Sequence, residues 1–393
     1  MNETTSRLFD VDWSRFDPWK VTPVRHRITE HPLLQINQLV QLSSRLAKYG
    51  RIRTHSSDAY AGTAFNHAPM LYPNQRSPEE TLANIASAKA WMSLLNVQTD
   101  DIYRVPLMLV MSIVSKPYVF DLTHGQSLIE YLVQAGFDVY LIDWGTPRPE
   151  HSSVSIDDYV PDWIPDCISQ VQRHSGEREI SLLGYCLGGI LTLLYAALEP
   201  KGPVKNLPLL TTPINSEGME MQRQLATGID ADRMIDMLGN VPTEVVQAGF
   251  QIQRPLQTTA GQLMLMNKST DREFIKVHMR LVRWGDEALP IPGETFRQMH
   301  HDIFLENKIV RGEFKVRGRK MNLRDIRVPV LHVLAQHDHV VPYPAARDVI
   351  QLVGSRDKEE WVIPGGHVSV VTGLGAVTRT WPRLAAWLAD RSV

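Results

Sequence analysis

The chain has 393 residues, of which 43% are hydrophobic and 21% are charged, with a formal net charge of −2 and a pI near 6.7. This length and composition suit one large globular domain or two smaller ones. The near-neutral charge removes any global electrostatic argument for a nucleic-acid partner or an anionic membrane surface.

The start of the chain and its cysteines bear on its location. The first residues, MNETTSRLFDVDW, lack the basic-then-apolar pattern of a secretory signal, and no apolar run approaches the roughly 20 residues that span a bilayer. Cys167 and Cys186 are the two cysteines, and a reducing compartment is the simpler interpretation of so few. We therefore expect a cytoplasmic protein without a transmembrane segment.

Residues 1–98 are mixed in pattern, and we predict an N-terminal helical segment of unclear role. One helix start is well marked, because Ser77 can cap it, Pro78 suits its first turn and Glu80 completes a capping box. We expect this helix to run to about Leu95.

From residue 99 onward, apolar strands alternate with helical segments. This alternation is typical of a mostly parallel sheet that is covered by helices on both faces, an α/β fold. The expected strands are VPLMLVMSIV (105–114), FDVYLIDW (137–144), the run that ends at Leu183, VKNLPLLTT (204–212), VPVLHVLA (328–335) and EEWVIP (359–364). The expected helices lie near residues 125–135, 164–173, 190–197, 343–352 and 378–389.

Residues 214–326 interrupt this alternation with helical patterns and without matching strands. An insertion at this point of such a scaffold is where lids are placed. We therefore predict a lid (cap) subdomain at 214–326, inserted into a catalytic core made of residues 99–213 and 327–393.

Cys186 stands between an apolar strand and an apolar helix, in the sequence LGYCLGGI. Gly184, Gly188 and Gly189 flank it at the spacing of a nucleophile elbow, a sharp strand-to-helix turn that lifts one side chain clear of the sheet. Glycines are needed there because the tight turn brings backbone segments close together. A cysteine that only fills the core needs no such neighbours, so we predict that Cys186 is a nucleophile.

A nucleophile in this scaffold needs an acid after a later strand and a histidine after the last strand. Asp338 follows the strand at 328–335, and His367 follows the strand at 359–364. We expect His367 to take the thiol proton of Cys186 and Asp338 to hold the histidine tautomer. The alternatives are helix capping for Asp338 and an ordinary loop position for His367. We expect a structural role for Cys167, which lies in a predicted amphipathic helix.

Two clusters, HHD at 300–302 and HDH at 337–339, suggest a metal site as an alternative. Neither has a companion ligand set at recognisable spacing, and no Walker-type or dinucleotide-binding loop is present. We expect no metal and no cofactor, and we interpret KVRGRK (315–320) as a solvated turn rather than a phosphate site.

Several segments together resemble the polyhydroxyalkanoate synthases. They are GYCLGG, KPYVFDL (116–122), FDVYLIDWGTP (137–147), TTPIN (211–215), ENKIVRGEF (306–314), AQHDHVVP (335–342) and PGGHVS (364–369). The resemblance covers about residues 100–391 and is strongest to the catalytic subunit of the two-component class III synthases, with class IV second. It implies an α/β-hydrolase fold with Cys186 as the acylated nucleophile, His367 as its base and Asp338 as the acid.

The resemblance also implies a reaction and its participants. The chain would polymerise (R)-3-hydroxyacyl-CoA into polyester with release of CoA, binding this substrate and the growing chain. A second synthase subunit, a homo-oligomer and a place at the surface of polymer granules are implied as well. The backbone N–H groups of Leu187 and Ser115 would form the oxyanion hole, although family members often carry an asparagine in the loop where this chain has Val114-Ser115-Lys116.

Two other functions remain open from the residues alone. The chain could be a cysteine-nucleophile α/β hydrolase, acting as a thioesterase or esterase on a small acyl substrate. It could also be a granule-associated homologue without activity, although the complete set of Cys186, Asp338 and His367 argues against this.

Overall fold

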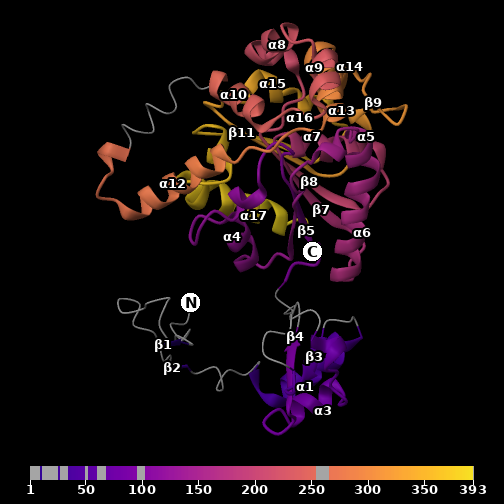
Figure 1. Cartoon of the computed structure of the whole chain (residues 1–393), viewed down its shortest axis with the longest axis vertical. Coiled ribbons are helices and arrows are strands. Elements are labelled where there is room, and N and C mark those ends of the chain that lie inside the picture. The colour runs from indigo at the N-terminus through magenta and orange to yellow at the C-terminus, as the bar shows by residue number, and fades with distance from the viewer. Residues whose placement is uncertain are drawn as a thin grey trace. The chain divides into compact units, whose positions relative to one another are not determined.

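A computed structural model describes residues 9–10, 25–26, 34–48, 52–59, 68–94, 102–253 and 265–392. The chain divides into two compact units, Met1–Asp100 and Asp101–Val393, whose elements are labelled in Figure 1. The boundaries of a core and a lid within the second unit stay a prediction.

The first unit combines helices with two pairs of antiparallel strands. Its described elements are β1 (Phe9–Asp10), β2 (Arg25–His26), α1 (Ile36–Ala47), β3 (Ile52–Ser56), α2 (Ala68–Leu71), α3 (Pro78–Ala83) and β4 (Ala90–Leu94). The capping box at α3 is confirmed, because Oγ of Ser77 accepts the N–H of Glu80 at 3.1 Å and Oε2 of Glu80 accepts the N–H of Ser77 at 3.2 Å.

The predicted continuation of this helix to Leu95 was wrong, and the described part of the first segment contains strands as well as helices. The helix ends at Ala83, and β4 pairs with β3 from Ile52↔Leu94 to Ser56↔Ala90. Lys89, just before β4, has a left-handed backbone (φ 46°) that a helix does not contain. Hydrogen bonding to a distant strand here outweighs the local helical preference.

The second unit is built on a six-stranded sheet in which every pairing is parallel, in the order β12-β11-β8-β7-β5-β6. The strands are β5 (Leu107–Val110), β6 (Val139–Ile142), β7 (Ile180–Tyr185), β8 (Val204–Leu210), β11 (Val330–Ala335) and β12 (Lys358–Ile363). All six expected strands are therefore present, although most are shorter than the apolar runs that predicted them.

Helices cover both faces of this sheet. The longer ones are α4 (Leu128–Gln134), α6 (Ile164–Ser175), α7 (Leu187–Leu198) and α17 (Trp381–Ala389). The two segments expected as single helices at 343–352 and 378–389 are each divided, into α15 (Tyr343–Ala346) and α16 (Asp348–Leu352), and into η10 (Ala376–Thr380) and α17. Shorter helical turns are η3 (Pro117–Phe120), η4 (Pro149–His151), α5 (Ile156–Asp158), η5 (Tyr159–Trp163) and η9 (His367–Val370).

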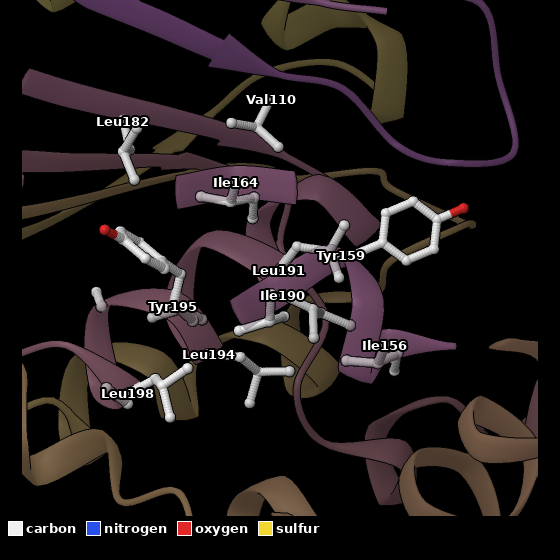
Figure 2. Packing of buried hydrophobic residues seen from close by; sticks show 14 of the residues in the cluster. Val110, Ile156, Tyr159, Ile164, Leu182, Ile190, Leu191, Leu194, Tyr195 and Leu198 are labelled. Carbon is white, nitrogen blue, oxygen red and sulfur yellow. The ribbon is translucent and has the colours of Figure 1, made fainter. Parts of the chain in front are cut away.

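The pleat of the strands sorts the core into two clusters. Val110 of β5 packs with α6 and α7, whereas its neighbour Leu109 packs with α4 and α17, because successive side chains of a strand point to opposite faces. Figure 2 shows the first cluster, with Val110 and Leu182 on the strands and Ile190 and Leu194 on α7. α7 is buried from Gly188 to Leu198, so the start of the helix is anchored against the core.

The inserted segment at 214–326 is predominantly helical, as expected. Its described elements are η6 (Ser216–Gly218), α8 (Glu220–Thr227), α9 (Ala231–Leu238), α10 (Thr243–Gln253), α12 (Arg272–Asp286), α13 (Gly293–Gln298), η7 (Met299–Leu305), α14 (Lys308–Arg311), β9 (Lys315–Val316), β10 (Arg319–Lys320) and η8 (Leu323–Asp325). In Figure 1, α8, α9, α13 and α14 gather at one end of the second unit. None of the helices in the described ranges combines the length and the apolar character needed to cross a membrane.

Candidate active site

Cys186 occupies a strained turn between β7 and α7. Its backbone has φ 55° and ψ −120°, a conformation that residues other than glycine rarely adopt and that concentrates at functional sites. The N–H of Cys186 donates to the carbonyl of Leu210 at 2.9 Å, which ties the turn to the end of β8. The side chain is 9% exposed, so its sulfur is nearly shielded from bulk water.

The glycines around Cys186 are required because neighbouring backbone fills the space of a side chain. A Cβ on Gly188 would overlap the carbonyl oxygens of Val110 and Met111 at the end of β5. A Cβ on Gly184 would lie 2.5 Å from Cα of Gly189, across the turn. These close approaches let α7 begin directly against the strand ends.

His367 and Asp338 come together because their turns are hydrogen-bonded. Asp338 follows β11, His367 follows β12, and the N–H of His337 donates to the carbonyl of Gly365 at 2.9 Å. Nδ1 of His367 lies 2.7 Å from Oδ2 of Asp338, and the two side chains are 8% and 0% exposed. The side chain of Cys186 lies close enough to His367 to raise the pKa of its imidazole.

The second carboxylate oxygen of Asp338 is held by the backbone. Oδ1 accepts the N–H groups of Val340 and Val341, at 2.9 and 2.8 Å. The carboxylate can only accept, so Nδ1 of His367 carries the hydrogen that it donates to Oδ2. This arrangement leaves Nε2 of His367 for the sulfur of Cys186.

The surroundings of His367 favour its protonated form. Burial by itself lowers the pKa of this imidazole, but the charges of Asp338 and Cys186 and the polar interactions with both side chains raise it to about 9. His367 is therefore suited to hold a proton beside the sulfur of Cys186.

Cys186 lies on the wall of a cavity of about 240 Å³ that is lined mainly by apolar side chains. Segments outside the inserted segment contribute residues such as Val114, Leu187 and Val340. The inserted segment contributes residues such as Met219, Phe250 and Phe296. A small apolar group attached to the sulfur would be shielded here from water.

The two predicted oxyanion donors differ in placement. Leu187 lines the cavity and is the first residue of α7, so its N–H has no acceptor within the helix. The loop after β5 reaches the cavity through Val114, and Ser115 is not among the described residues that line it. The carbonyl of Val114 accepts the N–H of Leu289 at 2.9 Å, which ties this loop to the inserted segment. The assignment of the N–H groups of Leu187 and Ser115 to an oxyanion hole stays a prediction.

The alternative histidine clusters are dispersed. In HDH, His337 and His339 are exposed while Asp338 bonds to His367. In HHD, Nε2 of His300 lies 2.9 Å from the carbonyl of Ala226, and His301 is paired with an aspartate. Across the described ranges, no three side chains of His, Cys, Asp or Glu gather as metal ligands would.

Cys167, the second cysteine, lies in α6 and is partly buried. Burial and then the charge of Asp166 raise the pKa of its thiol, which opposes formation of a reactive thiolate. Cys167 therefore fits a structural position.

The fold and the site define an α/β hydrolase, and the family profile for the α/β-hydrolase fold matches residues 119–374. The crystal structure of a proposed lipase from Sulfolobus solfataricus shares this fold, with a TM-score of 0.50 and 16% identity, over 77% of this chain and 89% of that chain. At this level of identity the likeness concerns the fold alone.

More specifically, the chain belongs to the poly(3-hydroxyalkanoate) polymerase family. It is 32% identical over 289 residues to the polymerase subunit PhaC of Allochromatium vinosum, which covers 73% of this chain and 81% of that relative. It is also 32% identical over 301 residues to the PhaC subunit of Haloferax mediterranei, spanning 75% of this chain and 61% of the relative's length. The resemblance seen in the sequence is confirmed, and by family the chain is an acyltransferase.

Proposed function

We propose that this polymerase converts (R)-3-hydroxyacyl-CoA into polyester with release of CoA, through an acyl-enzyme on Cys186. One observation carries the proposal: Cys186 lies on the wall of an apolar cavity and interacts with His367, whose Nδ1 lies 2.7 Å from Oδ2 of Asp338. The family supplies the class of reaction, and this arrangement supports a role for each residue.

In the first step, His367 takes the thiol proton of Cys186 and the sulfur attacks the thioester carbonyl of the substrate. The carbonyl oxygen becomes an oxyanion, which the N–H of Leu187 at the start of α7 is suited to stabilise. The bond from carbon to the CoA sulfur then breaks, and His367 returns the proton to CoA. One thioester replaces another, so the step is nearly balanced in free energy.

In the second step, the hydroxyl of another hydroxyacyl unit attacks the thioester on Cys186. His367 accepts the hydroxyl proton and returns it to the sulfur, while an oxoester bond joins the two units. An oxoester is more stable than a thioester, so this step runs downhill and drives chain growth. With a serine nucleophile, the free energy gained on going from thioester to oxoester would be released in the first step, and none would remain to drive the second.

Water competes with the attacking hydroxyl, because hydrolysis of the acyl-enzyme would release a free hydroxy acid. The apolar lining of the cavity, including Met219 and Phe250 of the inserted segment, supports exclusion of water from the thioester. This is the role that we assign to residues 214–326 as a lid.

The proposal also covers partners and location. The resemblance to the class III subunit supports a second synthase subunit, a homo-oligomer and a place at the granule surface. Large apolar side chains are exposed on the inserted segment, among them Met237 and Leu238 on α9 and Val245 and Ile252 on α10. Such side chains would favour contact with an apolar polyester.

Purified protein given 3-hydroxybutyryl-CoA tests the proposal, with CoA release and product mass followed together. Polymer is expected, with low activity of the chain alone and strong activation by a candidate second subunit. Free 3-hydroxybutyrate would instead identify a thioesterase, and absence of turnover with and without the subunit would identify a non-catalytic homologue. High activity of the isolated chain without a lag would contradict the two-component assignment.

A further inference from the structure

Two residues that line the apolar cavity beside Cys186 each carry a buried polar atom that the protein does not satisfy. Within the described part of the chain, Nδ1 of His300 and Oγ of Ser216 are buried without a hydrogen-bond partner, and both residues line the cavity. The side chains of Gln222 and Asn215, which also line the cavity, form hydrogen bonds with other residues. Gln222 donates to the carbonyl of Val340 at 3.1 Å, and Oδ1 of Asn215 accepts two N–H groups.

The unsatisfied nitrogen of His300 is an acceptor. Nε2 of this ring lies 2.9 Å from the carbonyl oxygen of Ala226, which can only accept, so Nε2 carries the hydrogen. In the neutral imidazole the other nitrogen, Nδ1, then has a free lone pair and no hydrogen.

The ring of His300 is held in one orientation by the residues packed around it. His300 is 3% exposed, and its ring centroid lies 6.0 Å from that of Phe296 and 5.0 Å from that of His301. It belongs to η7, a π-helical turn, and such turns recur at functional sites. The acceptor is therefore held in a fixed position on a residue that lines the cavity.

A buried acceptor without a donor is unfavourable, so a ligand of this cavity that brings a donor hydrogen gains from meeting it. A polyester repeat offers only carbonyl and ester oxygens, which cannot donate. A 3-hydroxyacyl group carries one donor, its hydroxyl, on an otherwise apolar chain.

We infer that Nδ1 of His300 accepts a hydrogen bond from the hydroxyl of the 3-hydroxyacyl group, and so selects hydroxyacyl over plain acyl substrates. This inference rests on the proposed function and assigns His300 as a specificity-determining residue. It makes no claim on the proton transfers at Cys186, which belong to His367.

Acylation of Cys186 in a single turnover, measured as CoA release from 3-hydroxybutyryl-CoA and from butyryl-CoA, tests this role. The two substrates share the CoA moiety and differ only in the hydroxyl. The parent protein is expected to prefer the hydroxyacyl substrate by about tenfold or more. His300→Phe should slow acylation by 3-hydroxybutyryl-CoA by about that factor and leave butyryl-CoA unchanged.

Two further variants complete the test. His301→Phe changes the adjacent histidine, which is 39% exposed and pairs with Asp232, and should keep the parent preference. His300→Asn places an amide oxygen near the position of Nδ1 and should restore part of the preference that His300→Phe loses. The ratio of the two rates is read within each variant, so a general loss of stability does not mimic the effect.

Several outcomes would overturn the inference. Equal slowing of both substrates would show that His300 contacts the CoA arm, whose amides also donate, or acts only on structure. No preference in the parent protein, or an unchanged preference in His300→Phe, would remove the role altogether. If the parent protein releases CoA from neither substrate, both with and without the candidate second subunit, the proposed function itself has failed, which is a distinct result.

Discussion

Nδ1 of His367 lies 2.7 Å from Oδ2 of Asp338, while Oδ1 of the same carboxylate accepts the N–H groups of Val340 and Val341. The two backbone donors fix which oxygen faces the histidine. The carboxylate of Asp338 therefore dictates the tautomer of His367 as well as supporting its charge.

Asp338→Asn should be severe for this reason. The amide oxygen would stay with the donors of Val340 and Val341, so the amide NH2 would face Nδ1 of His367. The histidine could avoid two opposed donors only by moving its hydrogen to Nε2, where it no longer serves as a base for Cys186. We expect kcat to fall on the order of 10⁴-fold, the effect of neutralising a triad acid.

His339→Gln is the control for this substitution, because His339 is adjacent to Asp338 but exposed. It should change kcat little. A larger loss for His339→Gln than for Asp338→Asn, measured as CoA release at saturating substrate, would mean that the acid has been assigned to the wrong residue.

Cys186→Ser tests the thioester relay, in which the acyl group passes from CoA to the sulfur of Cys186 as a thioester and then to a hydroxyl as an oxoester. The elbow holds either side chain in the same place, but the serine proton is harder to remove and the acylated serine is an oxoester. Acylation should fall steeply, and transfer to the next hydroxyl should lose its driving force even where acylation occurs. Mass spectrometry of the protein and of the products should show trapped or slowly hydrolysed acyl groups and little polymer. Polymer made at near the parent rate would refute the relay.

His367 predicts a dependence of stability on pH. Its pKa is raised from 6.5 to about 9, so the folded protein binds the proton more tightly than the unfolded chain. The stabilisation is complete below about pH 6.5 and is lost as the pH rises towards 9, and it amounts to on the order of 3 kcal/mol.

Denaturant unfolding of the parent protein and of His367→Gln, at pH 6 and pH 9.5, measures this contribution. The difference in free energy of unfolding between the two proteins should shrink at the higher pH. A difference that grows with pH would show that the imidazole is neutral in the folded protein.

Gly188→Ala should destabilise the elbow. Its Cβ would overlap the carbonyl oxygens of Val110 and Met111, which are backbone atoms of a buried strand and cannot move aside cheaply. Gly285→Ala, in the exposed part of α12, is the matched control, because nothing lies within 4 Å of its Cβ. We expect a loss of about 1–3 kcal/mol for the first variant and a gain of up to about 1 kcal/mol for the second. Equal effects on the denaturation midpoint would contradict the close contact of α7 with β5.

The lid hypothesis predicts a difference in amide hydrogen exchange. Residues 214–249 should exchange faster than the strands around Leu109, Leu141 and Leu182, because a segment that admits substrate must open locally. Equal protection in all four regions would remove the lid hypothesis.

Much of this protein could be predicted from local patterns in the sequence. The glycines around Cys186, the order Cys186, Asp338, His367 and the six apolar strands each depend on a few consecutive residues. Strand periodicity and the need for glycine in a tight turn act within such short segments. The position of a residue just after a parallel strand then places it at the carboxyl edge of the sheet, wherever the rest of the chain lies.

Other features depended on segments that are distant in the sequence. Residues 90–94 pair with β3 instead of continuing a helix, because hydrogen bonds from a strand about 40 residues earlier stabilise them more than local propensity favours the helix. The loop after β5 reaches the cavity through Val114, and the carbonyl of Val114 accepts the N–H of Leu289, which lies far away in the sequence in the inserted segment.

The environment of His300 likewise depends on segments that are distant in the sequence. In the sequence, His300 is one of two adjacent histidines, for which the pattern HHD suggests a metal cluster as an alternative. The packing of η7 against α8 places the carbonyl of Ala226 next to Nε2 of His300 and leaves Nδ1 buried and without a hydrogen-bond partner. Whether a polar atom finds a partner is decided by which distant backbone folds next to it, so only the tertiary structure could determine it.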